Sequence, residues 1–324
     1  MGVKDTATIK MMRQNRFFAD AFNFFIYGGR QVIQPSALRE IDTRELDMPY
    51  GGAQGAEIPV QKTRDVIKAV AMMDSNRAYL LLAQELQSDV HYAMPVKNMI
   101  SDALQYAKQV EKAAASHKEA KDYKSGAEYL SGFRKDDRLL PVVTLVIQFN
   151  DMSWDGPMSL HEMFGEQDEE ILRLVPDYNI NLISPKAMPD SDFTKFQSTL
   201  GEVLSFIKYR KDPDKLQEML DKRPGFHSMG RDEVDVLNAC VNAGLVMEES
   251  EVSLDVCEAI QIMKDRSMKQ GIEQGIEQGE MQARKETAIT LAGMGMPAEQ
   301  IAEVVKVSVK MVQEWLSGGV NPAR

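Results

Sequence analysis

The stretch from residue 64 to residue 88, RDVIKAVAMMDSNRAYLLLAQELQS, contains two apolar runs on either side of a short polar break. The first run is rich in β-branched residues and ends at the polar break Asp74-Ser75-Asn76. The second run extends from Ala78 to Ala83. Two consecutive apolar runs joined by a tight polar turn predict a β-hairpin.

Helical and strand patterns flank this hairpin. Residues 15–27 (NRFFADAFNFFIY) place phenylalanines close to one helical face, and residues 95–118 repeat apolar positions at helical spacing from Pro95 onward. Residues 139–149 (LLPVVTLVIQF) form a continuous apolar run, as a strand buried on both faces does. With a loop at residues 40–61, the order helix, strands, helix, strand predicts a three-layer α/β unit.

The pattern after Pro185 is helical and acidic. Three amphipathic segments, residues 193–209, 214–222 and 231–246, predict the helices of a small subdomain. They are followed by the repeat GIEQGIEQGEMQARKE, in which glycines recur every four residues. Each glycine weakens a helix by about 1 kcal/mol relative to alanine, but this spacing lines the glycines up for close approach of another helix. A solvated linker and a dimerising or interdomain helix are therefore both open.

The last forty residues resemble a helix-turn-helix. Pro297 predicts the start of one helix with an inward apolar face over residues 301–305, and Ser308 is the predicted N-cap of the next. A helix that reads DNA needs basic or amide side chains toward the groove. The candidates here are Lys306, Lys310 and Gln313. Because only two of them are basic, a helical docking module is the alternative.

Composition narrows the class of protein. The chain of 324 residues can form one large core or two domains, and no apolar run approaches the roughly 20 residues of a membrane helix. The N-terminus lacks the apolar stretch of a signal peptide. Two cysteines without Cys-x-x-Cys spacing support neither a disulfide framework nor a zinc site. We therefore expect a protein of the reducing cytoplasm without a membrane partner.

The charge is unevenly distributed along the chain. A net charge of −11 opposes an extended nucleic-acid surface, because phosphates are neutralised by Lys and Arg. Residues 61–150 nevertheless carry 13 Lys and Arg against 11 Asp and Glu. The predicted hairpin thus lies in the least acidic part of the chain, which is compatible with DNA contact.

Candidate chemistry gathers at the hairpin. Side chains two apart on a strand share a face, so Glu85 and Gln87 point the same way, and Asp65 on the partner strand can converge on them. Two carboxylates at one sheet edge are costly to bury unless a cation lies between them, and Mg²⁺ is held by such carboxylates with water and phosphate oxygens. The pattern favours metal-assisted phosphodiester hydrolysis, with solvated strand-end carboxylates as the alternative.

Longer blocks of the chain resemble the bacterial Rpn family of recombination-promoting nucleases, often labelled transposases, of the PD-(D/E)xK superfamily. The similar blocks occur in the family's order between residues 15 and 183: NRFFADAFNFFIYGGRQVI, KTRDVIKAV, LQSDVHYAMPVKNMISDALQYAKQV, YLSGFRKDDRLLPVVTLVIQF, WDGPMSLHEMF and VPDYNINLI. The resemblance implies the superfamily's three-layer αβββαβ core.

The resemblance also implies roles for individual residues. The superfamily's motif aspartate matches Asp65, and the acid of its (D/E)xK matches Glu85. The superfamily lysine falls on Gln87, which is similar to the family's E-x-Q form and would orient the attacking water. The backbone carbonyl of Leu86 is the implied further ligand of Mg²⁺, for which Mn²⁺ could substitute. Accessory candidates, each with a purely structural alternative, are Asp20, Tyr92, Lys97 and Tyr106.

Together these observations predict a metal-dependent DNA endonuclease associated with recombination or mobile elements. The alternative is a non-catalytic DNA-associated or protein-interaction module on a nuclease fold. A homo-oligomer would form through the repeat helix. The predicted organisation is a nuclease-like domain at 1–190, a helical subdomain at 191–267, the repeat helix or linker at 268–286 and the helix-turn-helix-like unit at 287–324.

Overall fold

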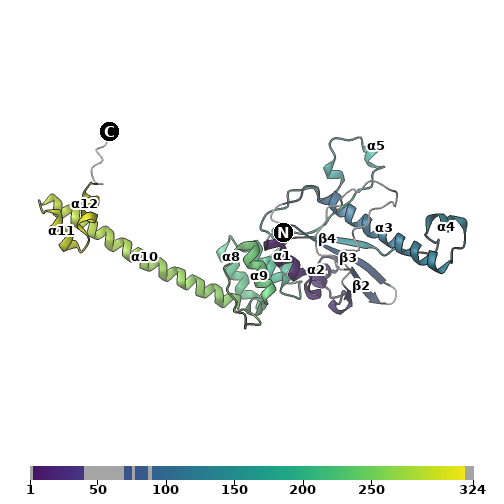
Figure 1. The fold of residues 1–324 in the computed structure, drawn as a ribbon, viewed down its shortest axis with the longest axis horizontal. Coiled ribbons are helices and arrows are strands. Elements are labelled where there is room, and N and C mark those ends of the chain that lie inside the picture. The colour runs from purple at the N-terminus through teal and green to yellow at the C-terminus, as the bar shows by residue number, and fades with distance from the viewer. Residues whose placement is uncertain (1–2, 40–68, 75–76, 87–89, 318–324) are drawn as a thin grey trace. The chain divides into compact units, whose positions relative to one another are not determined.

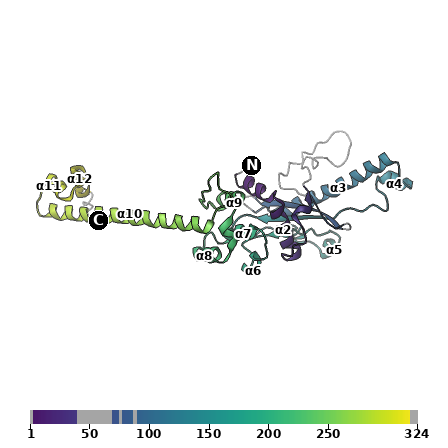
Figure 2. The same ribbon diagram turned by 90° about the horizontal axis from the view of Figure 1, so that it is seen from below.

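The computed structural model describes residues 3–39, 69–74, 77–86 and 90–317, with the two hairpin strands described through their backbone. The chain forms two compact units, residues 1–257 and residues 258–324 (Figures 1 and 2). This division differs from the boundaries predicted at residues 190 and 267. Helix α1 (Val3–Met12) packs against α9 (Arg231–Val241), and this contact keeps the helices after residue 190 in the same unit as the sheet.

The first unit starts with two helices, continues into a sheet and ends in a group of short helices. Its other helices are α2 (Asn15–Tyr27), α3 (Met94–Ala120), α4 (Gly126–Ser131), α5 (Glu169–Leu172), α6 (Asp190–Phe193), α7 (Leu200–Tyr209) and α8 (Pro213–Lys222), with the 3-10 turns η1 (Pro35–Ala37), η3 (His161–Met163) and η4 (Pro224–Ser228). Its strands are β1 (Leu38–Arg39), β2 (Ala69–Asp74), β3 (Arg77–Leu86), β4 (Val142–Gln148) and β5 (Asn181–Ile183). The helices predicted at 15–27, 95–118 and 214–222 are confirmed.

The five strands form one sheet in the order β1-β2-β3-β4-β5. The first three are antiparallel neighbours, whereas β4 runs parallel to β3 and β5 runs parallel to β4. Strands β2 and β3 confirm the predicted hairpin, and β4 confirms the strand predicted within residues 139–149. Parallel neighbours need a crossover connection, and α3 lies in the crossover between β3 and β4 (Figure 1). The protein therefore has a mixed α/β fold.

Strand β4 is covered on both faces. Thr144 donates a hydrogen bond to Asp102 of α3, and Val146 packs with Met94 at the start of α3. Because alternate residues of a strand face opposite sides, Leu145 and Ile147 point away from α3, and both are buried. Burial of both faces explains why the strand is apolar along most of its length instead of alternating.

The helix predicted over residues 193–209 is confirmed from Leu200 to Tyr209 as α7, but its first part is wrong, because residues 194–199 separate α6 from α7. The Asp20 carboxylate on α2 accepts hydrogen bonds from the backbone N–H groups of Gln197 (3.0 Å) and Ser198 (2.8 Å) and from the Ser198 hydroxyl (2.6 Å). These groups lie just before α7, where N–H groups lack partners within the helix. The break is thus stabilised by a residue from a distant part of the chain.

The helix predicted over residues 231–246 is shorter than expected and ends at Val241. Asn242 adopts a left-handed conformation with φ 54°, which terminates the helix. The Asn238 side chain then exchanges two hydrogen bonds of 2.8 Å with the backbone of Leu245. This local pairing competes successfully with the helical continuation.

The glycine repeat lies inside α10 (Val256–Gly293), a single helix of 38 residues. The repeat is therefore helical, and both alternatives, a solvated linker and a dimerising or interdomain helix, stay predictions. A Cβ atom added at Gly271, Gly275 or Gly279 would meet no described atom within 4 Å. Among the described residues, these glycines thus have an open side.

The second unit ends in α11 (Ala298–Val305) and α12 (Val309–Ser317), which confirm the predicted pair of tail helices. Its core consists of Ala288, Ile301, Ala302, Val305 and Val312. Ser308 accepts a hydrogen bond from the backbone N–H of Met311 (3.2 Å), as predicted for the N-cap. Lys306, Lys310 and Gln313 are all exposed on this unit.

None of the described helices is long and apolar enough to cross a membrane.

Candidate functional site at the carboxyl edge of the sheet

Strands β3, β4 and β5 run parallel and end at the same edge of the sheet. In register, Glu85 pairs with Ile147, which in turn pairs with Ile183, and Leu86 pairs with Gln148. In open α/β sheets, ligands bind outside the carboxyl ends of the strands. The predicted ligand positions Glu85 and Leu86 therefore lie at the edge where such a fold binds ligands, whereas Asp65 and Gln87 lie outside the described residues.

Buried polar atoms without partners occur at this edge. Gln148, at the end of β4, is fully buried, and its Nε2 donates to Asn150 Oδ1 (2.8 Å). Among the described residues, four buried atoms here have no hydrogen-bond partner: Gln148 Oε1, Asn150 Nδ2, Trp154 Nε1 and Ser184 Oγ. Most buried polar atoms in proteins are satisfied, so each exception calls for a water, an ion or a ligand. A cluster of exceptions marks this edge as a site prepared to receive one.

The start of α3 belongs to the same edge, because the helix begins eight residues after β3 ends. Asn98, in its second turn, is 1% exposed, and its Oδ1 also has no partner among the described residues. At the start of α3, the N–H of Met94 donates to the His91 carbonyl (3.0 Å), and Pro95 has no N–H. The positive end of the helix dipole still favours nearby negative charge. The edge thus offers neutral oxygen acceptors beside the positive end of a helix dipole.

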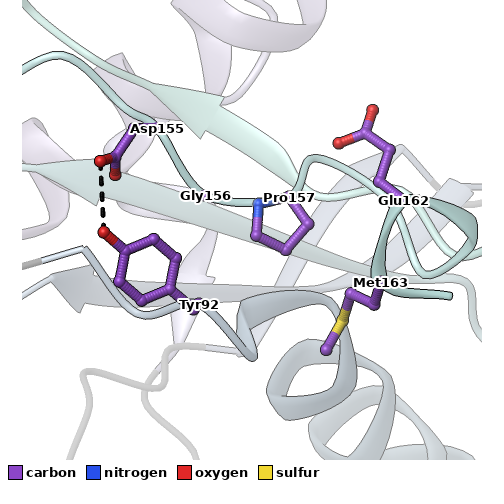
Figure 3. Close-up of a pocket in the computed structure, with 6 residues that line it drawn as sticks. All are labelled: Tyr92, Asp155, Gly156, Pro157, Glu162 and Met163. Atoms are coloured by element: carbon purple, nitrogen blue, oxygen red, sulfur yellow. Dashed lines mark hydrogen bonds between the residues drawn. The ribbon is translucent and has the colours of Figure 1, made fainter. Parts of the chain in front are cut away.

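A pocket of about 490 Å³ lies between the start of α3 and the β4–β5 connection (Figure 3). The Tyr92 hydroxyl donates to Asp155 Oδ2 (3.2 Å) on one side, and Glu162 and Met163 lie on the other side of Pro157. Gly156 is needed here, since a Cβ atom at this position would lie 2.9 Å from Val90 Cγ1. Tyr92 therefore contributes to a pocket wall, as an accessory role requires.

A second pocket, of about 690 Å³, shares Gly156 with the first. Its wall combines aromatic rings, the unpartnered Trp154 Nε1 and Ser184 Oγ, and two lysines: Phe24, Phe25, Trp154, Ser184, Lys186 and Lys195. Lys195 is paired with Asp192 at 2.5 Å, whereas Lys186 has no ion pair with any described residue. Aromatic rings can stack on a nucleobase, and a neighbouring lysine can pair with its phosphate.

The β4–β5 connection is fixed at its start by a charge cluster. Asp151 accepts from Arg210 (3.0 Å) and Lys211 (2.7 Å) at the end of α7. Burial acts to raise the pKa of Asp151, but the hydrogen bonds from these two cations outweigh it and lower the pKa to about 2. Asp151 is therefore ionised at neutral pH and serves as an anchor of the connection.

The other accessory candidates make structural contacts. Asp20 is 2% exposed and holds the start of α7, as described above. The Tyr106 hydroxyl accepts a hydrogen bond from the backbone N–H of Val142 (3.1 Å) and so fixes the beginning of β4. Lys97 is half-buried in the first turn of α3. Only Tyr92 and Lys97 of the four thus lie near the carboxyl edge.

A buried acid of α3 was not predicted from the sequence. Asp102 accepts hydrogen bonds from Thr144 of β4 and from the Tyr178 hydroxyl. Burial raises the pKa of Asp102, and these two hydrogen bonds oppose the rise. Burial is also the first cause of the raised pKa of Tyr178, followed by its bond to Asp102. The network joins α3 to β4 and β5 behind the edge and holds the helix in place.

The edge residues Gln148, Trp154, Asp155 and Ser184 were also not singled out from the sequence. A signal was available, because the polar stretch QFNDMSWDG directly follows the buried strand. Leu86 pairs in register with Gln148, and the Leu86 carbonyl and Gln148 Oε1 are neutral oxygen donors, a ligand type that hard divalent cations accept. The donor atoms that the described residues supply are therefore of the type that a hard divalent cation binds. Comparisons with protein-family models, curated proteins and solved structures return no match.

Proposed function

We propose that this chain is a metal-dependent DNA endonuclease with a PD-(D/E)xK-like core. The observation that carries the proposal is the group of buried, unpartnered polar atoms beside the end of β3, where Glu85 and Leu86 lie next to Gln148. The order of elements supports it as well: a helix, an antiparallel hairpin and a helical crossover into a parallel strand.

Asp65 and Glu85 would hold Mg²⁺ with the Leu86 carbonyl. When bound, such an ion polarises the scissile phosphate and lowers the pKa of the attacking water. Gln87, being neutral, would orient that water without adding the positive charge of a lysine. A modest cleavage rate is therefore expected. Lys186, in the wall of the 690 Å³ pocket, and the positive end of the α3 dipole are described features that favour the phosphates of DNA.

Plasmid nicking tests the proposal, with Mg²⁺ and Mn²⁺ each omitted in turn. Asp65→Ala and Glu85→Ala should lower the rate by about 100-fold or more, because a metal supplies several kcal/mol of transition-state stabilisation and each 1.4 kcal/mol is tenfold. Glu170→Ala is the matched control, since Glu170 is an exposed carboxylate on α5. Equal nicking by all three folded variants would reject the proposal.

A non-catalytic module is the second candidate, and the net charge of −11 favours it. Calorimetry distinguishes the two. Saturable Mn²⁺ binding that disappears in Asp65→Ala supports the enzyme, whereas DNA or protein binding without any Mn²⁺ binding supports the module.

A further inference from the structure

Three metal-ligating side chains meet at the end of the first unit, away from the predicted metal ligands in sequence. They come from two segments, η4 and the residues that open α10: His227, Asp255 and Cys257. Their ligand atoms all lie within 4.8 Å of one another, and His227 Nδ1 is 2.8 Å from Asp255 Oδ2. His227 is exposed and the other two are half-buried, so an ion can reach the cluster from solvent.

The backbone holds the two segments together. Met229 and Leu254 form an antiparallel bridge, with N–H···O distances of 3.0 Å and 2.8 Å. Met229 is fully buried, so this bridge is anchored in the core. The bridge places His227, two residues before Met229, near the segment that carries Asp255 and Cys257.

The turn that carries His227 is also held by contacts with α7. Arg223, just before η4, forms a buried ion pair of 3.0 Å with Glu202 of α7, and Phe226 is fully buried. A Cβ atom at Gly225 would lie 2.6 Å from the same Glu202 carboxylate, so the turn approaches α7 as closely as glycine allows. The position of His227 is therefore set by the fold and does not depend on its contact with Asp255.

The charges around Cys257 suit a cation. Its thiol donates to the Leu220 carbonyl (3.5 Å), and the carboxylates of Asp255 and Asp221 lie close enough to act on it electrostatically. A divalent ion neutralises such carboxylates and binds sulfur as the thiolate.

We propose that His227, Asp255 and Cys257 bind a zinc-type divalent ion that fixes the first turn of α10 to η4. Nitrogen, sulfur and oxygen donors together are typical of Zn²⁺, whose ligands lie at about 2.0 to 2.3 Å. Ligands of a tetrahedral Zn²⁺ lie roughly 3.5 Å apart. The widest donor pair, now within 4.8 Å, must therefore close by about 1 Å, and the His227–Asp255 pair, now 2.8 Å apart, must open slightly. Rotation of the exposed His227 side chain changes both distances. Binding releases the thiol proton to solvent and leaves the fourth tetrahedral position to water or to the nearby Asp221 carboxylate.

Cobalt absorption tests this site in the full-length protein. After metal removal with a chelator, Co²⁺ should produce a sulfur-to-metal charge-transfer band and tetrahedral visible bands at one equivalent per chain, and Zn²⁺ should abolish them. Carboxylate-bound Co²⁺ at the sheet edge has no sulfur ligand, so the band reports this cluster alone. The chain has only two cysteines, so the assignment reduces to Cys257 or Cys240.

Variants complete the test. Cys257→Ser should remove the charge-transfer band, and His227→Gln and Asp255→Asn should weaken Co²⁺ binding by about 10-fold or more. Cys240→Ser is the matched control, since Cys240 is buried within α9, and it should keep the band. Zn²⁺ should also raise the melting temperature of the parent but not that of Cys257→Ser. Absence of the band in the parent, or its persistence in Cys257→Ser, would overturn the proposal.

Discussion

The two ends of α3 carry polar clusters that differ in whether their buried polar atoms have hydrogen-bond or ion-pair partners. At its C-terminal end, His117 contacts Asp122 (2.8 Å) and Asp137 (3.0 Å), and Arg134 pairs with Asp122 and Asp136 at 2.7 Å each. At its N-terminal end, Asn98 Oδ1 and the atoms of the sheet edge are buried without partners among the described residues. One end is a closed network, and the other is incomplete.

This difference is the basis for assigning a structural role to one end of α3 and the proposed function to the other. A satisfied network stabilises the elements that it joins, here α3, α4 and the segment before β4. Buried unsatisfied atoms lower stability unless an ordered water, an ion or a ligand completes them. A search for a site by the number of charged residues would have selected the C-terminal end of α3, because the closed network there has more of them.

Of the variants that test this comparison, Gly156→Ala should produce the largest change. The added Cβ would lie 2.9 Å from Val90 Cγ1 and within 3.4 Å of the Trp154 ring. Overpacking of this kind costs about 1 to 3 kcal/mol, and displacement of Trp154 should lower plasmid cleavage by about tenfold or more. Chemical denaturation and nicking assays measure the two effects.

Two further variants control for this change. Gly165→Ala has open space within 4 Å and should behave like the parent. Val90→Ala in the Gly156→Ala background should restore part of both losses, since it removes the clashing methyl groups. Full activity of Gly156→Ala would show that the site does not depend on this contact.

Gln148→Leu should separate stability from function. Leucine has a similar size and removes the unpartnered Oε1, whose desolvation costs about 1 to 3 kcal/mol, but it also loses one hydrogen bond of about 1 kcal/mol to Asn150. The free energy of unfolding should therefore stay the same or rise by about 1 kcal/mol, while Mn²⁺ or DNA binding weakens by about tenfold. A destabilised variant with unchanged binding would mean that the amide is structural.

Arg134→Met should give the opposite result at the closed end. It removes the ion pairs to Asp122 and Asp136, so hydrogen-exchange protection of residues 121–137 should fall severalfold. Cleavage should be unchanged, because, among the described residues, none of the unpartnered edge atoms is bonded to this cluster. Reduced cleavage would show that the two ends are coupled through α3.

The smallest effect should be the pH dependence of the closed end. Hydrogen bonding to Asp122 raises the pKa of His117, burial opposes this, and Asp137 adds to the rise. Since the folded pKa lies above the unfolded value of about 6.5, this stabilisation is complete below about pH 6.5 and is lost as the pH rises through the folded pKa.

Nuclear magnetic resonance of the His117 ring measures this titration directly. Exchange protection of residues 121–137, corrected for the intrinsic exchange rate, should decrease as the pH rises above about 6.5. His117→Gln should abolish that pH dependence. Persistence of the dependence in the variant would assign it to another group.

The sequence by itself determined the elements whose patterns are long and local. The phenylalanine-rich α2, the apolar periodicity of α3, the two runs of the hairpin and the continuous apolar β4 were all predicted at nearly their observed positions. Ser308 was likewise identified as an N-cap, because capping depends on residues three apart. The proposed ligands Asp65, Glu85 and Gln87 also came from a local pattern, and they remain predictions.

Only the tertiary structure decided the features made by distant residues. Asp20 breaks a predicted helix 177 residues away, and Asp102 finds its partners 42 and 76 residues later. His227 shows no ligand spacing in the sequence, yet the Met229–Leu254 bridge brings it to Asp255 and Cys257. Helical and strand periodicity report which face of one element is buried, whereas hydrogen-bond partners and ligand sets depend on how the elements pack. For that reason the sequence predicted the layers of this protein, and the fold assembled its polar clusters.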